Sequence, residues 1–338
     1  MEMENASFIA EYSLSNVTDV MNDSRCPEPG GIIYMALECY PVTVAILVSN
    51  IVLCILATVI IFMNVLSATA VYLRDEVDNP SDLLIASLAI SDTVVGMFLV
   101  YQSAYNLGNW QVFLECLFRY GILASANISS MFHLCLLTID RYVKITRPYL
   151  YPRVFTNKFV IGISFATWLL SLFLGFLPML GWNKGTPLSR RAQCGFYFVM
   201  DRGYILFLDI LFYAPVIVNI FLYGHMFKVA QRHAKVIAAQ QSTTSDIGPS
   251  KGTLQFAKTV FILMGLYVAC WTPTGIFMFL EYHDHLEYMS LADKGMVMMY
   301  LSVLAYINSL VNPIVYAIKI PYIKKKFGQV SDKMLCRK

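Results

Sequence analysis

Three neighbouring residues of different chemistry, Asp140, Arg141 and Tyr142, stand at one end of a long apolar stretch. An acid beside a base can transfer protons or can hold a conformation through a salt bridge. Hydrolysis is disfavoured, because the chain has no Gly-x-Ser-x-Gly nucleophile elbow and no histidine and acid arranged around a nucleophile. We therefore predict that the protein is not an enzyme.

Further polar side chains recur inside the apolar stretches, where such groups are costly and usually mark a site. Asp92 is the most informative, because no basic residue of its own stretch can neutralise it. Its carboxylate needs either a cation or hydroxyl and amide partners. The other polar residues at this depth are Asn64, Asn127, Ser130, His133, Asp209, Asn219, Asn308, Ser309 and Asn312.

The composition indicates that membrane-spanning helices position these side chains. The 338 residues are 57% hydrophobic and only 14% charged, whereas a typical soluble domain is about 25% charged. A helix needs about 20 apolar residues to cross the roughly 30 Å hydrocarbon core of a bilayer. Suitable stretches lie at about 41–73, 80–104, 113–145, 158–181, 203–233, 253–281 and 293–318. The predicted fold is therefore an all-α membrane protein, a bundle of seven transmembrane helices.

The distribution of Lys and Arg predicts the orientation, because these residues accumulate in short cytoplasmic loops. With the amino terminus outside, most of the 25 basic residues fall on the cytoplasmic side. The chain then divides into an extracellular segment, 1–40, a transmembrane domain, 41–318, and a cytoplasmic segment, 319–338. The last segment begins with a short amphipathic eighth helix. We expect a multi-pass protein of the plasma membrane.

Covalent modifications are expected on both sides of the membrane. Acceptor sequences of the form Asn-x-Ser/Thr in the outer segment predict N-glycosylation at Asn5, Asn16 and Asn22. Cys116 and Cys194 both fall on the oxidising outer side and are expected to form a disulfide. Cys26 and Cys39 are also outside and are candidates for a second bridge, since sequence alone does not fix connectivity. Cys336, beside lysines at the inner leaflet, is a candidate for palmitoylation.

Taken together, these residues resemble the signatures of rhodopsin-class (class A) G-protein-coupled receptors, with one signature in each predicted helix. The signatures are Asn64, Ser87-Leu88-Ala89-Ile90-Ser91-Asp92, Cys116 with Asp140-Arg141-Tyr142, Trp168, Pro215 with Tyr223, Cys270-Trp271-Thr272-Pro273 and Asn312-Pro313-Ile314-Val315-Tyr316. Within the class, the stretches 176–183, 223–238 and 256–273 resemble a cluster of adenosine, lysophospholipid, cannabinoid and melanocortin receptors. The adenosine receptors are the most similar named family.

The resemblance implies that the protein signals to a heterotrimeric G protein, with arrestin as a second partner. Arg141, held by Asp140, resembles the arginine that restrains the resting receptor and contacts the G protein once helix six moves outward. A residue near Thr253 replaces the acid that usually pairs with this arginine, which predicts raised basal signalling. The residues expected to act in coupling and activation are Asp140, Arg141, Tyr142, Tyr149, Tyr223, Trp271, Asn312, Pro313 and Tyr316.

The resemblance also implies an allosteric sodium ion beside Asp92, and no other cofactor. A hard cation prefers several oxygen ligands and would neutralise an otherwise unpaired carboxylate. The expected ligands are Asp92, Ser130, Asn308, Ser309 and Asn312, with Trp271 close by. A polar network filled with water, without bound sodium, is the alternative.

The predicted ligand site is apolar with few polar anchors, which suits a small neutral ligand. By resemblance it is formed by Leu123, Ala124, Asn127, Phe196, Trp271, Thr274, Gly275, Met278, Ser302 and Tyr306. Leu123 stands where aminergic receptors carry an acid, and Tyr306 stands where opsins carry the retinal-binding lysine, so monoamines and retinal are disfavoured. Phe196 matches the stacking phenylalanine of adenosine receptors, but Tyr197, Met278 and Tyr306 replace three polar groups that bind adenine.

Because the adenosine receptors are the most similar named family, adenosine is the first ligand to consider. An orphan receptor for a neutral lipid-derived ligand is the alternative. A membrane transporter is a remote alternative, because the sequence contains no internal duplication of the kind that transporters show. No nucleic acid is expected among the partners.

Overall fold

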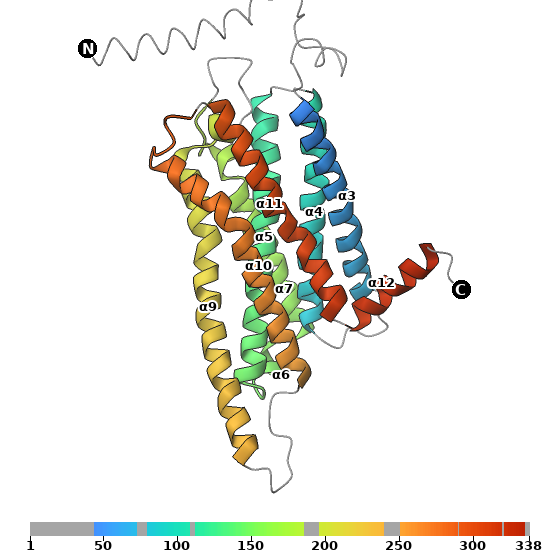
Figure 1. Cartoon of the computed structure of the whole chain (residues 1–338). Coiled ribbons are helices and arrows are strands. Elements are labelled where there is room, and N and C mark those ends of the chain that lie inside the picture. The colour runs from blue at the N-terminus through green and yellow to red at the C-terminus, as the bar shows by residue number, and fades with distance from the viewer. Residues whose placement is uncertain are drawn as a thin grey trace, which may run out of the picture. The chain divides into compact units, whose positions relative to one another are not determined.

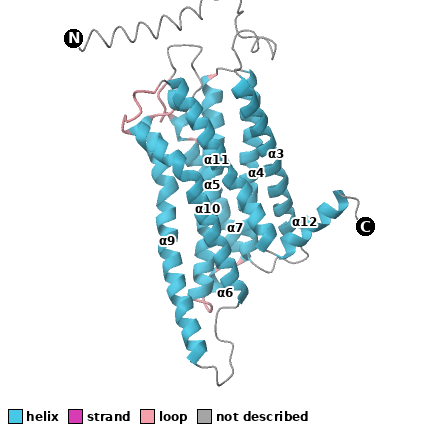
Figure 2. Ribbon diagram, viewed as in Figure 1, coloured by secondary structure: helices cyan, strands magenta, loops and turns pink. Residues whose placement is uncertain are grey.

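A computed structural model describes residues 44–72, 80–108, 112–185, 196–239, 251–289, 291–319 and 321–334, and these residues are almost entirely helical (Figures 1 and 2). The long helices are α3 (Val44–Tyr72), α4 (Pro80–Gly108), α5 (Phe113–Thr146), α7 (Asn157–Gly175), α9 (Arg202–Ala239), α10 (Lys251–Tyr282) and α11 (Leu291–Lys319). The shorter ones are α6 (Tyr151–Val154), the 3₁₀ turn η1 (Leu177–Leu180), α8 (Phe196–Val199) and α12 (Pro321–Met334). Within the described ranges, 7 helices are long and apolar enough to cross a membrane, which confirms the predicted fold class.

The helix bounds agree with the predicted ones to within four residues, except at the ends of the fifth and fourth spans. The fifth, α9, extends to Ala239, beyond the predicted residue 233, whereas the fourth is shorter than predicted. We predicted that this span reaches residue 181, but α7 ends at Gly175 and is followed by η1. The reason is Pro178, which disfavours helical dihedrals at the preceding residue and cannot donate a backbone hydrogen bond. Gly181 then takes a left-handed conformation, with φ of 113°, and ends the turn.

The chain divides into two compact units, 1–52 with 103–110 and 53–102 with 111–338. The described part of the smaller unit consists of the start of α3 and the end of α4. There Asn106 donates from Nδ2 to Oδ1 of Asn50 over 3.1 Å. All the contacts discussed below lie within the larger unit.

In the larger unit α5 is the central helix, because it contacts α7, α9 and α10 along its length. It meets α7 closely at Gly175, where a methyl group would lie 2.6 Å from the backbone nitrogen of Ser125 and 2.8 Å from the carbonyl oxygen of Gly121. Tyr204 of α9 joins this contact by donating its hydroxyl to the carbonyl oxygens of Leu174 and Gly175, each over 3.2 Å. The small size of Gly175 and Ser125 thus allows α5 and α7 to approach each other closely.

Three helices of the larger unit are interrupted by internal prolines: Pro215 in α9, Pro273 in α10 and Pro313 in α11. Each removes a backbone hydrogen bond and weakens the helix at that point. One turn after Pro215, Asn219 donates from Nδ2 to the Pro215 carbonyl over 2.7 Å. Neither α5 nor α7 contains a proline.

The short helix α12 follows α11 and turns away from it (Figure 1). Ile323 is fully buried and Phe327 packs against the core, whereas Lys324 and Lys325 are exposed. This separation of apolar and basic residues confirms the predicted amphipathic eighth helix.

Several predicted modification sites lie outside the described residues: Asn5, Asn16, Asn22, Cys26, Cys39, Cys194 and Cys336. Cys116, at the start of α5, is disulfide-bonded. Its pairing with Cys194 stays a prediction, as do the glycosylation and the palmitoylation.

Candidate functional site

The end of α5 holds the Asp140–Arg141 pair in a closed polar network. The guanidinium Nη2 of Arg141 lies 2.7 Å from Oδ2 of Asp140, and both side chains are buried. Ser81, next to the first residue of α4, donates to the same carboxylate oxygen over 2.8 Å and accepts a hydrogen bond from Arg141. The structure therefore confines the arginine to the interior, against its acidic neighbour.

The second partner of Asp140 is Tyr151, on the short helix α6. Its hydroxyl donates to Oδ1 of Asp140 over 2.8 Å. Burial raises the pKa of Tyr151, and the nearby Asp140 carboxylate raises it further, so the phenol stays a neutral donor. Sequence reasoning missed both Ser81 and Tyr151, because nothing in the pattern of the loops reveals which hydroxyl reaches a given carboxylate.

The other residues expected to couple to a G protein lie around this network to different extents. Tyr223 of α9 has its hydroxyl 3.4 Å from that of Thr138, and its ring packs edge-on against Phe261 of α10 at 5.2 Å. The ring of Tyr142 lies 5.6 Å from that of His225. Tyr149 is 86% exposed and stands apart from the network.

Two further predictions about activation concern Tyr316 and Thr253. The hydroxyl of Tyr316 is buried and has no hydrogen-bond partner among the described residues, which leaves it available for a different arrangement of the helices. The side chain of Thr253 is outside the described part, so the predicted rise in basal signalling stays a prediction.

A second polar centre surrounds Asp92 in the middle of the larger unit. Ser130 of α5 donates to Oδ1 over 2.9 Å, and Asn312 of α11 donates from Nδ2 to Oδ2 over 2.7 Å. Ser309 also hydrogen-bonds to the carboxylate, and its own carbonyl accepts from Nδ2 of Asn64 over 2.9 Å. The structure thus joins α3, α4, α5 and α11 through residues that the sequence analysis had selected.

Trp271 of α10 lies against α9 and marks the third part of the site. Its indole ring stacks on Phe212, with centroids 4.7 Å apart and planes 24° apart. The ring of Tyr267, one turn earlier in α10, lies 6.1 Å away. Phe212 was not among the predicted site residues.

Five of the ten predicted ligand-binding residues pack in two apolar clusters. Leu123 and Tyr306 pack against the cluster that contains Phe98 and Leu99. Phe196, Trp271 and Met278 belong to the larger core cluster, while Ala124 is half-buried and Gly275 is buried.

The polar members of the predicted ligand set donate to backbone carbonyls. Asn127 donates to Leu123 over 2.9 Å and Ser302 donates to Met298 over 2.7 Å, both within their own helices. Thr274 donates across to Leu301 of α11 over 3.3 Å. Each of these three polar side chains thus has a backbone partner, and most of the other predicted ligand residues are apolar or aromatic.

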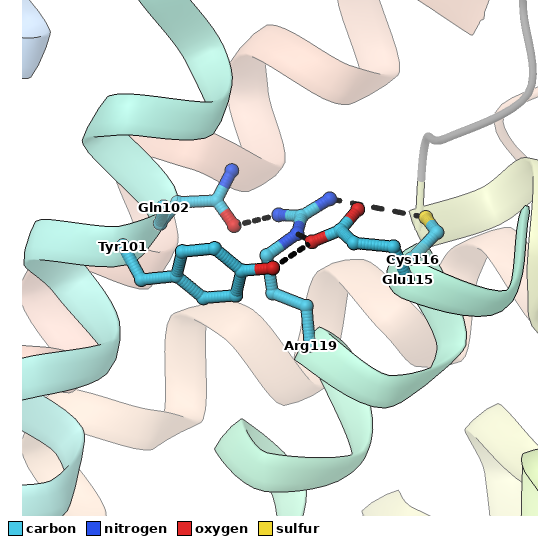
Figure 3. Close-up of polar contacts among 5 residues, drawn as sticks. All are labelled: Tyr101, Gln102, Glu115, Cys116 and Arg119. Atoms are coloured by element: carbon cyan, nitrogen blue, oxygen red, sulfur yellow. Dashed lines mark hydrogen bonds and ion pairs between the residues drawn. The ribbon is translucent and has the colours of Figure 1, made fainter. Parts of the chain in front are cut away.

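A buried ion pair adjoins these residues, and sequence reasoning missed it. Arg119 donates from Nε to Oε1 of Glu115, one turn earlier in α5, over 3.1 Å. Tyr101 of α4 donates to the same oxygen over 2.6 Å, and Arg119 also donates to the side-chain carbonyl of Gln102 (Figure 3). The spacing of four residues between acid and base could have revealed the pair.

The ion pair contacts the predicted ligand residues through Tyr120. The guanidinium of Arg119 lies 4.9 Å from the centre of the Tyr120 ring, which in turn packs edge-on against Phe196 at 5.4 Å. The side chain of Arg119 is completely buried, whereas that of Glu115 is 21% exposed. A cation is therefore held inside the protein, with the Tyr120 ring linking it to Phe196.

Three features of the site are typical of a seven-transmembrane receptor. They are the buried Asp140–Arg141 pair at one end of α5, the central Asp92 carboxylate, and Trp271 stacked between two proline-containing helices. Residues 63–316 match the family described as 7 transmembrane receptor (rhodopsin family), and the chain belongs to that family. It is a G-protein-coupled receptor and not an enzyme.

Individual relatives include receptors of different ligand classes. The chain is 30% identical to adenosine receptor A2b of Gallus gallus over 84% of its own length and 88% of the relative's. It is 29% identical to adenosine receptor A2a of Homo sapiens, over 81% and 70% of the two chains. It is also 30% identical to trace amine-associated receptor 9 of Rattus norvegicus, over 80% and 82%.

Proposed function

We propose that the receptor lies in the plasma membrane with its amino terminus outside, binds a small neutral ligand there, and signals through a heterotrimeric G protein to cAMP. The observation that carries the proposal is the confinement of Arg141 between Asp140 and Ser81. A buried guanidinium released from this network would gain a free set of donors for a partner protein. Arrestin is the second proposed partner.

Adenosine is the first ligand that we propose. Its support is the likeness to adenosine receptors over more than four-fifths of the chain and the position of Phe196 in the core beside Tyr120. Tyr197, Met278 and Tyr306 stand where adenosine receptors carry adenine-binding groups. Adenosine should therefore bind this receptor more weakly, since each lost hydrogen bond to a polar site costs about 1–3 kcal/mol.

We expect adenosine to change the cAMP level of cells that express the receptor, and Arg141→Ala to reduce that response about tenfold or more. The reason is that hydrogen bonds to a charged group are worth about 1.5–3 kcal/mol each. Arg147→Ala is the matched control, because Arg147 follows α5 closely but is exposed. A cAMP response that survives Arg141→Ala would contradict the proposed coupling.

A neutral lipid-derived ligand is the second candidate. It is favoured by the apolar packing of Leu123 and Tyr306, and by the engagement of Asn127 and Ser302 with carbonyls of their own helices. Silence toward adenosine, together with basal signalling that Arg141→Ala removes, would favour this candidate over adenosine.

We also propose that the Asp92 centre binds sodium. The residues fit a hard cation, because the side-chain oxygens of Asn308 and Asn312 are buried without a hydrogen-bond partner among the described residues. Asp92, Ser130, Asn308, Ser309 and Asn312 would hold the ion. Bound sodium would supply a positive charge that neutralises the carboxylate.

Sodium is expected to raise the melting temperature of the purified receptor relative to choline at the same ionic strength, and Asp92→Asn is expected to abolish the difference. A ligand at 100 times its dissociation constant stabilises by about 2.7 kcal/mol. Ser91→Ala is the control, since the Ser91 hydroxyl donates only within its own helix. An equal melting temperature in sodium and in choline would instead support a water-filled network.

A further inference from the structure

Two consecutive residues of α9 contact Trp271 in different ways. Phe212 stacks on the indole ring, as described above, whereas Tyr213 donates its hydroxyl to the backbone carbonyl of Trp271 over 3.1 Å. The Tyr213 hydroxyl also hydrogen-bonds to the side chain of Thr272. Side chain and backbone of this turn of α10 are therefore both attached to α9.

The fit of Tyr213 against α10 depends on Gly275, which lies one turn after Trp271. A β-carbon at this position would lie 2.6 Å from Cε2 and 2.8 Å from Cζ of the Tyr213 ring, and closer still to the hydroxyl oxygen. Any side chain at position 275 would thus occupy the space of the phenol. The absence of a β-carbon is what allows the hydroxyl to reach the Trp271 carbonyl.

The same turn of α10 is weak by itself. Pro273 lacks the backbone N–H that would bond to the carbonyl of Ala269, so this part of the helix has fewer hydrogen bonds of its own. A hydrogen bond supplied from another helix matters most at such a break. In the arrangement described, Arg141 is still paired with Asp140, so the bond from Tyr213 belongs to the restrained receptor.

We propose that Tyr213 is a positioning residue for signal transmission: its hydroxyl fastens the Trp271–Pro273 turn of α10 to α9 and so restrains the movement of α10. The inference rests on membership of the receptor family and on these contacts, and it does not depend on which ligand binds. It explains why a tyrosine on α9 faces a glycine on α10. Release of this bond would let α10 turn about Pro273.

The test compares Tyr213→Phe with Tyr204→Phe in the purified full chain. Tyr204 is a closely matched control, because it also lies on α9 and donates its hydroxyl to helix carbonyls, but those carbonyls belong to α7. We expect Tyr213→Phe to speed amide hydrogen exchange in residues 271–277 about fivefold, the effect of losing one neutral hydrogen bond. Tyr204→Phe should leave exchange in this segment unchanged.

A functional measurement separates positioning from simple structural support. Tyr213→Phe should raise basal nucleotide exchange on a panel of purified heterotrimeric G proteins about fivefold, and Gly275→Ala should act in the same direction by displacing the phenol. The proposal is overturned if residues 271–277 exchange at the wild-type rate in Tyr213→Phe, or if Tyr204→Phe accelerates them equally. Faster hydrogen exchange without any rise in nucleotide exchange would also overturn it.

Discussion

Glu115→Gln is expected to lower the free energy of unfolding by about 3–5 kcal/mol, because it removes the carboxylate that pairs with the buried guanidinium of Arg119. The side chain of Arg119 is fully buried, so water cannot replace the lost carboxylate. Two other neighbours of Arg119, Gln102 and the Tyr120 ring, carry no negative charge. Thermal unfolding of the purified receptor in detergent measures the loss.

An exposed ion pair of the same receptor provides the comparison. Arg202 and Asp284 lie 2.5 Å apart, but their side chains are 52% and 42% exposed. The hydrogen bond from Arg202 lowers the pKa of Asp284, yet solvent screens such surface pairs. Asp284→Asn should therefore shift the melting temperature much less than Glu115→Gln does. Similar shifts for both variants would mean that burial does not govern the strength of the Arg119 pair.

Gly175→Ala is expected to destabilise the receptor by about 1–3 kcal/mol, the usual cost of overpacking. The new methyl group would meet the Ser125 hydroxyl and two backbone atoms of α5, and the backbone cannot move aside as a flexible side chain can. The yield of folded receptor after detergent extraction and its melting temperature measure the effect.

Gly162→Ala is the matched control on the same helix. A β-carbon at Gly162 would meet no atom within 4 Å. Replacing a glycine inside a helix by alanine ordinarily stabilises by roughly 0.5–1 kcal/mol. The two substitutions in α7 should thus change stability in opposite directions, and a stabilising Gly175→Ala would refute the close approach of α5 and α7.

The sequence predicts the helices well because hydrophobic length alone determines them. The error at the end of the fourth span arose from the apolar residues around Pro178, which kept the hydropathy high after the backbone had left the helix. Boundaries set by a single proline are invisible to a criterion based on hydrophobic length. The amphipathic helix α12 was predictable from the sequence, because its apolar residues recur with helical spacing among basic and polar ones.

The polar sites were predictable only in part. Asp92 and its partners were found because a carboxylate at membrane depth requires neighbours, and few candidates existed. Tyr151 and Ser81 were missed because each is an ordinary hydroxyl residue whose role appears only when the fold brings it to Asp140. Tyr213 was missed for a related reason, since its partner is a backbone carbonyl and the decisive feature is the small size of Gly275.

The prolines of α9, α10 and α11 divide the helices of the larger unit into two groups that differ in stiffness. Helices α5 and α7 meet closely at Ser125 and Gly175 and contain no proline, whereas each of the other three helices is weakened at its internal proline. A ligand that binds with micromolar affinity supplies about 8 kcal/mol, which is comparable to the whole stability of a typical domain. A fraction of that energy, acting at the three prolines, can reorient α9, α10 and α11 while α5 and α7 keep their packing.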